Sequence, residues 1–225
     1  VSNSSFYSSG SQCHNLEQAI YRIGFNEVYK LVVFIASNKL LSGTNNLYGY
    51  PPNKLWEESV SCATILLQIA PHAGEDKDTA YTIGLLHAIG KMALDSYFKN
   101  SNHKAPTRTF KQDDPDAERK LIGVDHAELG AELLQRWNFL EDITEPTRNQ
   151  YDPSVMEQYR KMGLLLQCSK NSLPYLDLTP QEISQQFCSP DEVKEHTDTT
   201  DEEWVYAIIS AKAMLYDIHD MINDL

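Results

Sequence analysis

Apolar residues recur along this chain at intervals of three and four, the spacing of one face of an α-helix. The clearest cases predict helices at 54–70, 76–98 and 155–171. The segment 16–35 has the same spacing, but Gly24 interrupts it and indicates two short helices or a bend. No strand-like alternation runs longer than four residues. The pattern therefore predicts an all-α fold built as a multi-helix bundle.

A further helix has a clear start signal. Asp125 stands at the N-cap position and Glu128 follows three residues later, which is the spacing of a capping box. One face of this helix then carries His126, Leu129, Gly130, Leu133, Leu134 and Trp137. The polar segments 42–53 and 99–112 contain Pro and are expected to be loops, and a short helix is expected to follow the second one, up to Leu121.

The charge pattern changes near residue 188 and suggests three parts: a helical domain at 1–187, a linker at 188–200 and a terminal helix at 201–225. Between Cys188 and Glu203 there are seven acids and one lysine, which is typical of a solvated, mobile connection. Thr200 and Glu203 form a second capping-box pattern. The terminal helix is amphipathic, with an apolar seam of Trp204, Ile208, Ala211, Leu215, Ile218, Ile222 and Leu225. This seam could pack on its own domain, on a partner or on a second copy in a homodimer.

Composition narrows the functional classes. The 225 residues include 32 acids and 19 bases, a formal net charge of −13, which argues against binding to nucleic acid and to anionic membranes. The longest apolar run, Leu31 to Ala36, is far short of the ~20 residues that span a bilayer. Four cysteines without a CxxC pair favour reduced thiols in a cytoplasmic protein. No Gly-rich phosphate loop follows a strand pattern.

His87 is the most informative of the seven histidines. It stands in the apolar string Gly84–Lys91, GLLHAIGK, where a polar imidazole must find a hydrogen-bond partner or a metal. The string resembles the HD signature, in which Asp follows His. Three more segments, in the same order, resemble the HDOD domain family, the all-helical signalling relatives of HD metal phosphohydrolases: Asn3–Tyr7 with Ala19–Gly24, Leu55–Val60, and Gly123–Ala131. Together these strings cover roughly residues 1–171.

The resemblance implies a bacterial signal-transduction protein, with further helices before Val1 in the full protein. It also implies where the metal ligands of an active HD enzyme would stand. The first His position falls on Glu58 or Ser59, and the His-Asp pair falls on His87 and Ala88. Alanine has no ligand atom, so the pair is broken.

The later ligand positions are also altered. The final Asp position falls near Cys168 and Ser169, and a later His-His region falls on 148–150, which contains no histidine. His126 matches a second-metal histidine of some relatives, with Asp125 beside it. No metal or other cofactor is therefore expected, and His87 and His126 are expected to form buried polar contacts between helices. The alternative is a divalent metal held by Glu58, His87 and His126.

Three functions follow from these alternatives. The first is a non-catalytic regulatory module that contacts a signalling protein. The second is a metal-dependent phosphohydrolase acting on a nucleotide or cyclic dinucleotide, with Lys91 or Arg119 holding phosphate. The third is ligand sensing without turnover, in which Lys91 and His87 bind a small molecule. The broken ligand set favours the first.

Overall fold

The protein is described by a computed structural model that covers residues 36, 38–43, 47–100, 110 and 114–223. The predicted segment 16–35 and the motif at Asn3–Tyr7 lie outside the described residues. Within the described ranges the chain is helical and contains no β-strand, which confirms the all-α prediction. The α-helices are α3 (Lys54–Ile69), α4 (Lys77–Leu86), α5 (Ile89–Asn100), α6 (Pro115–Ile122), α7 (His126–Arg136), α8 (Glu141–Arg148), α9 (Arg160–Ser172), α10 (Pro180–Gln186), α11 (Asp191–Thr197) and α12 (Asp201–Asn223), with two 3-10 turns, η1 (Pro153–Val155) and η2 (Leu173–Asp177).

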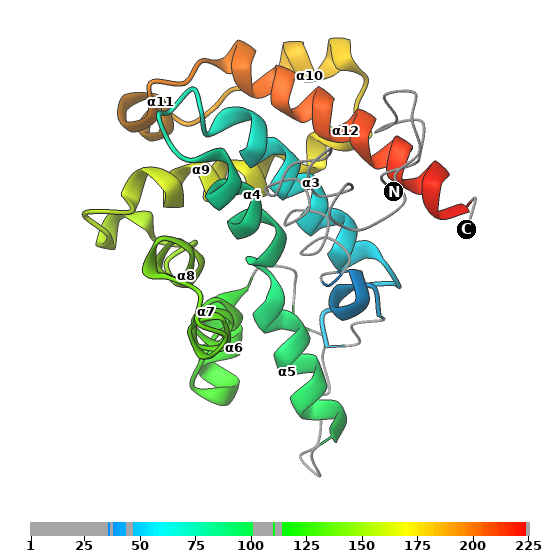
Figure 1. Cartoon of the computed structure of the whole chain (residues 1–225), viewed down its shortest axis with the longest axis vertical. Coiled ribbons are helices and arrows are strands. Elements are labelled where there is room, and N and C mark those ends of the chain that lie inside the picture. Colours follow the sequence, from blue (N-terminus) through cyan, green and yellow to red (C-terminus); the bar gives the residue numbers. More distant parts are fainter. Residues whose placement is uncertain (1–35, 37, 44–46, 101–109, 111–113, 224–225) are drawn as a thin grey trace, which may run out of the picture.

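Figure 1 shows α5, α6 and α7 at one end of the molecule and α10, α11 and α12 at the other, with α3, α4 and α9 between them. The helix ends follow local signals in the sequence. Asp114 caps α6 by accepting from the N–H of Ala117, Pro115 follows it, and Gly123 ends the helix at φ 81°. Such a left-handed conformation favours glycine. The side chain of Asp125 caps α7 as predicted, accepting from the N–H of Glu128 at 2.8 Å.

The helix predicted at 76–98 is two helices, α4 and α5, separated by a turn at His87 and Ala88. The N–H of Lys91 donates to the carbonyl of Ala88, three residues back, so the carbonyl of His87 is left without its regular helical partner. The turn brings α5 against α7 at Gly90, where an added Cβ would overlap the carbonyl of His126. The prediction of one continuous helix was wrong because this close approach is a tertiary feature.

Two buried clusters hold the bundle together. The larger one joins α3, α4, α9 and α12 and includes the fully buried Trp204. The second surrounds Trp56 and Tyr50 and joins α3 to α4 and α5. Burial of apolar area contributes about 25 cal/mol per Å², so these two clusters are the main source of stability. Some of the polar side chains buried beside these clusters form the site described below.

The segment 188–200 was predicted to be a mobile linker, and the structure corrects this. Residues 191–197 form α11, and Val193 and Thr197 are buried. The polar groups here find partners within the fold. The Thr199 hydroxyl accepts from the indole N–H of Trp204 at 3.0 Å, and Asp201 accepts from the Ser189 N–H at 2.8 Å. Net charge alone did not reveal these pairings, which let an acidic segment fold.

Helix α12 packs across α3, and its residues Trp204, Ala207, Ile208 and Ala211 belong to the larger cluster. The predicted capping box at its start is present, since Thr200 and Glu203 exchange backbone-to-side-chain hydrogen bonds of 2.8 and 3.3 Å. This part of the seam therefore packs on its own domain. The side chains from 217 onward lie outside the described residues. None of the helices described is both long and apolar enough to cross a bilayer.

Candidate functional site

His126, the first residue of α7, is fully buried against α6. Its backbone N–H donates to Glu118 Oε2 at 2.6 Å, and its ring Nδ1 lies 2.8 Å from Glu118 Oε1. On the opposite side of the ring, Nε2 lies 2.9 Å from the Tyr151 hydroxyl. Because a carboxylate only accepts, Nδ1 carries the proton and Nε2 accepts from Tyr151. The Tyr48 hydroxyl also donates to Glu118 Oε1 at 2.7 Å, so this carboxylate has three protein donors.

The charge states follow from burial and neighbouring charges. Burial is the largest influence on the pKa of His126 and lowers it, and the positive charges of Lys91 and Lys170 act in the same direction against the pull of Glu118. Burial works to raise the pKa of Glu118, but the hydrogen bonds from His126 and Tyr48 outweigh it and hold this pKa below its usual value. The pair is therefore a neutral imidazole beside a carboxylate.

Lys170 on α9 is buried, with 8% of its surface exposed. Its Nζ donates to Gln150 Oε1 at 2.8 Å and lies 3.7 Å from the centre of the Tyr151 ring, a cation–π contact. The Gln150 amide in turn donates to the carbonyl of His87 at 3.1 Å. This bond satisfies the carbonyl that the turn between α4 and α5 leaves open. Tyr48, Glu118, His126, Tyr151, Gln150 and Lys170 are therefore connected, and we call them the His126 network.

A second buried lysine lies close to this network. Lys91 is 3% exposed, and its Nζ is 3.4 Å from the Tyr50 hydroxyl and 5.6 Å from the centre of the Tyr48 ring. Lysine is almost never buried unless it is paired. Two ammonium groups and the Glu118 carboxylate therefore share this part of the interior, where each depends on the others for compensation.

The other predicted site residues are not all brought together. The ring Nδ1 of His87 bonds to the carbonyl of Gly84, three residues back, at 2.7 Å, whereas the ring of His126 joins α7 to α6 through Glu118. Asp125 caps α7 and pairs with Arg119 at 2.6 Å. Ala88 is buried, and the Ser169 hydroxyl is fully buried without a hydrogen-bond partner.

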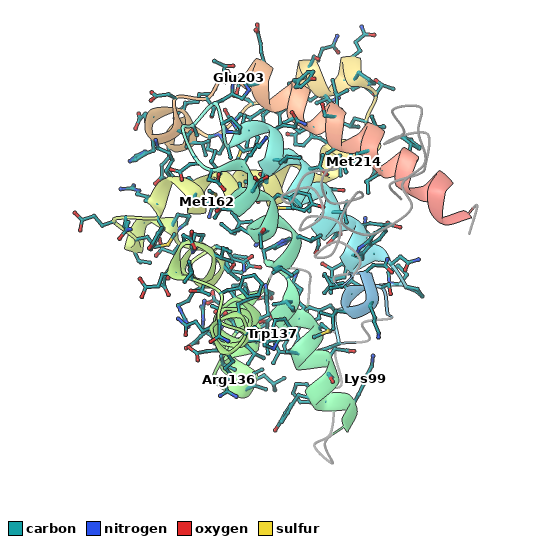
Figure 2. The ribbon with its side chains drawn as sticks, viewed as in Figure 1. Lys99, Arg136, Trp137, Met162, Glu203 and Met214 are labelled. Atoms are coloured by element: carbon teal, nitrogen blue, oxygen red, sulfur yellow. The ribbon has the colours of Figure 1, made fainter. Side chains whose placement is uncertain are left out.

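Glu58 lies elsewhere. It forms an ion pair with Lys54 at 3.6 Å and lines a surface pocket with Leu173 on η2 and Lys212 on α12. Figure 2 shows the side chains of the described helices around the bundle. Glu58 therefore lies on the side of α3 that faces α12 and η2.

The described residues do not fit a catalytic divalent metal. Such a site usually needs at least three protein ligands and an open position. Within the described ranges, no group of three or more His, Cys, Asp and Glu side chains is placed to share an ion. Both ring nitrogens of His126 have partners, Ala88 offers no ligand atom, and the two buried ammonium groups repel a dication. The alternative set of Glu58, His87 and His126 is not assembled.

Sequence reasoning missed Glu118, Tyr151, Gln150 and Lys170. The sequence did contain a signal for Lys170. This lysine follows the apolar stretch of α9, and a lysine at such a position is expected either to be buried with that stretch or to stand at the end of the helix. Glu118 had none, since a glutamate in a short, charged helix such as α6 is normally solvated. Its burial results from α7 folding back on α6.

Comparison with known proteins agrees with this fold. A "Putative phosphohydrolase" from Shewanella amazonensis SB2B matches with a TM-score of 0.70 and 20% identity, over 90% of this chain and 76% of that one. A "Putative signal transduction protein" from Marinobacter aquaeolei VT8 matches with a TM-score of 0.65 and 21% identity, over 95% and 49%. An HDOD domain protein of unknown function from Geobacter sulfurreducens gives 0.61 and 18%, over 94% and 77%. At these identities the likeness establishes a shared fold.

Sequence comparison identifies the family. An uncharacterized protein from Treponema pallidum (strain Nichols) is 25% identical in an alignment of 193 residues that covers 80% of this chain and 36% of that protein, so this chain spans about a third of that relative. The sequence model of the HDOD domain matches residues 1–153, more than half of the chain. The chain therefore belongs to the HDOD domain family.

Proposed function

We propose that this HDOD domain is a non-catalytic regulatory module in signal transduction that acts through contacts with a signalling protein. The His126 network is the observation that carries the proposal. The region in which an HD enzyme would hold metal instead contains a histidine with both nitrogens engaged and two buried lysines. The fold likeness to the Marinobacter protein named for signal transduction supports the same role.

The chemistry of hydrolysis also argues for this proposal. An HD-type phosphohydrolase needs a metal to polarise phosphate and to activate water. Neither Ala88 nor Ser169 can supply the carboxylate that such a dication requires, and a net charge of −13 opposes capture of anionic nucleotides. The fold is still suited to pass a structural change from one helix to another, because the His126 network joins α6 and α7 to α9 and to the turn between α4 and α5.

The test is a measurement of metal and turnover. The protein is purified without chelator, incubated with manganese, iron or nickel, dialysed and analysed for metal, and then assayed on bis(p-nitrophenyl) phosphate and cyclic dinucleotides. We expect far less than one metal per chain and no hydrolysis above buffer. Glu132→Gln is the matched control, because Glu132 pairs with Arg148 on the surface and belongs to neither the His126 network nor the alternative ligand set. Near-stoichiometric metal that is lost in His87→Ala and kept in Glu132→Gln would support the phosphohydrolase alternative instead.

The regulatory role needs its own test. A signalling protein captured by cross-linking in the cells that produce this chain should bind the purified domain in calorimetry with equal affinity before and after treatment with chelator. Equal affinity is expected because the contact surface does not depend on a metal. A partner that binds only after metal is added, and is then chemically changed, would contradict a non-catalytic module.

A further inference from the structure

Cys188, Lys194 and Asp201 meet where the chain enters and leaves α11. The Nζ of Lys194 lies 3.4 Å from Cys188 Sγ and 2.8 Å from Asp201 Oδ2. Asp201 is fixed in turn by the N–H and hydroxyl of Ser189, at 2.8 and 2.6 Å. The lysine is thus held by a second contact in a position where its nitrogen stays beside the sulfur.

Cys188 is also the described thiol that a solvent oxidant can reach. Cys62 and Cys168 are buried in the larger core cluster, and burial raises the pKa of Cys168 to about 12. Oxidation of cysteine requires exposure and a thiolate, so these two are poor targets. Cys188 is exposed, and the Lys194 side chain is 33% exposed. Cys13 lies outside the described residues.

We propose that Cys188 and Lys194 form an oxidative cross-link, in which hydrogen peroxide oxidises the thiol and the amine of Lys194 then bonds to the sulfur. In the first step the thiolate attacks one peroxide oxygen, the S–O bond forms and the O–O bond breaks. Sulfur gives up two electrons, and the second oxygen leaves as hydroxide, which becomes water by taking a proton from solvent. In the second step the neutral amine attacks the sulfenic sulfur. The S–N bond forms, the S–O bond breaks, and the hydroxyl leaves as water with a proton from nitrogen. The product is a sulfenamide, the same linkage that sulfenic acids form with backbone nitrogen.

The cross-link would change how α11 is held. The bond closes a loop from 188 to 194 and removes the positive charge that Lys194 offers to Asp201. Asp201 would keep Ser189 as its partner at the start of α12. The connection between α10 and α12 would therefore respond to oxidant at a position remote from the His126 network.

The protonation of Lys194 sets the pH dependence of the second step. The hydrogen bond with Asp201 raises the pKa of Lys194. Although burial works to raise it, the pKa of Asp201 is held at about 2 by its bonds to Lys194 and Ser189, so this carboxylate does not take up the proton. The amine must lose its proton to solvent, and cross-linking should therefore be faster at higher pH.

The test uses the whole chain, hydrogen peroxide and trypsin. Unmodified protein is cut after Lys170, Lys194 and Lys212, because these are the basic residues of this region. A cross-linked Lys194 has lost its charge, so cleavage there should stop and peptide 171–212 should appear, about 2 Da lighter than the intact segment because two hydrogens are lost. Dithiothreitol should restore cleavage, and the yield should increase with pH.

Two variants serve as controls. Lys194→Arg keeps the charge beside Asp201 but removes the nucleophilic amine, so peroxide should leave cleavage at this position intact. Cys188→Ser should behave in the same way, and unchanged thermal unfolding of both variants would show that they are folded. Cys188 that gains oxygen while trypsin still cuts after Lys194 would overturn the proposal, as would an unreactive Cys188 or a peptide 171–212 that persists in Cys188→Ser.

Discussion

The Glu118 carboxylate is fully buried and accepts from the His126 N–H, the His126 ring and the Tyr48 hydroxyl, at 2.6 to 2.8 Å. Glu118→Ala removes the acceptor of all three donors at once. It also removes the negative charge that raises the pKa of His126, and leaves the positive charges of Lys91 and Lys170, which lower that pKa. The variant therefore tests whether this carboxylate holds α6 and α7 together.

The magnitude follows from the number of donors. A buried donor left without a partner costs about 1–3 kcal/mol, and water entering the space left by the side chain recovers part of that cost. Three such donors, partly satisfied by water, give a loss of about 3–5 kcal/mol in the free energy of unfolding. Glu118→Gln keeps the shape and one acceptor, so we expect a smaller loss of about 1–3 kcal/mol.

Urea unfolding followed by circular dichroism at pH 7.5 measures both variants. Glu132→Ala is the matched control, because Glu132 is 52% exposed and pairs with Arg148 at 3.0 Å on the surface. Exposed pairs contribute about 0–1 kcal/mol, so the control should change the free energy of unfolding by no more than that. If Glu118→Ala and Glu132→Ala have equal effects, the buried carboxylate does not organise the site and the reasoning fails.

Three further predictions concern the fold around the site. The pKa of His126 is lower in the folded chain than its unfolded value of 6.5, so below pH 6.5 the unfolded chain binds a proton that the folded chain does not. The free energy of unfolding should therefore keep its full value above pH 6.5 and decrease as the pH falls below it. The variant His126→Asn should show a flatter dependence on pH. Trp204→Ala should reduce the free energy of unfolding by about 3–5 kcal/mol in urea titration, because the ring is fully buried between α12 and the core. Gly90→Ala should lower it by at least about 1–3 kcal/mol, since a new Cβ meets backbone of α7 that cannot move aside, and a neutral effect in thermal unfolding would contradict the close approach.

The helices that could be predicted from sequence are those that residues within the helix itself determine. Helix α3 was predicted from the regular spacing of its apolar residues, and the start of α7 from the capping residues Asp125 and Glu128. The turn between α4 and α5 was not, because its cause is the contact of Gly90 with α7, forty residues further along the chain in a different helix. Local pattern carries no information about such a contact.

The site shows the same division. His87 was expected to be buried because it interrupts an apolar face, and His126 because it matches a histidine of HD relatives; both are buried. Their distant partners were not predictable: Gln150, which donates to the His87 carbonyl, is 63 residues away, and Tyr151, which bonds to the His126 ring, is 25 residues away. The segment 188–200 failed for a related reason, because only its charge was counted, whereas its Ser189 and Thr199 form hydrogen bonds with Asp201 and Trp204 of α12.

The partners in the network also determine how difficult it would be to restore a metal site. Ala88→Asp recreates the His-Asp pair in sequence, but Lys91 lies only three residues further along, in the first turn of α5, and its N–H already bonds to the carbonyl of residue 88. We expect the new carboxylate to pair with this ammonium, while Ser169 still offers no carboxylate and both nitrogens of His126 remain engaged. Metal analysis after incubation with manganese should therefore give far less than one ion per chain for Ala88→Asp, as for the parent protein. Stoichiometric binding by this single variant would mean that the lysines do not oppose a dication, and that the missing aspartate alone prevents this domain from binding a metal.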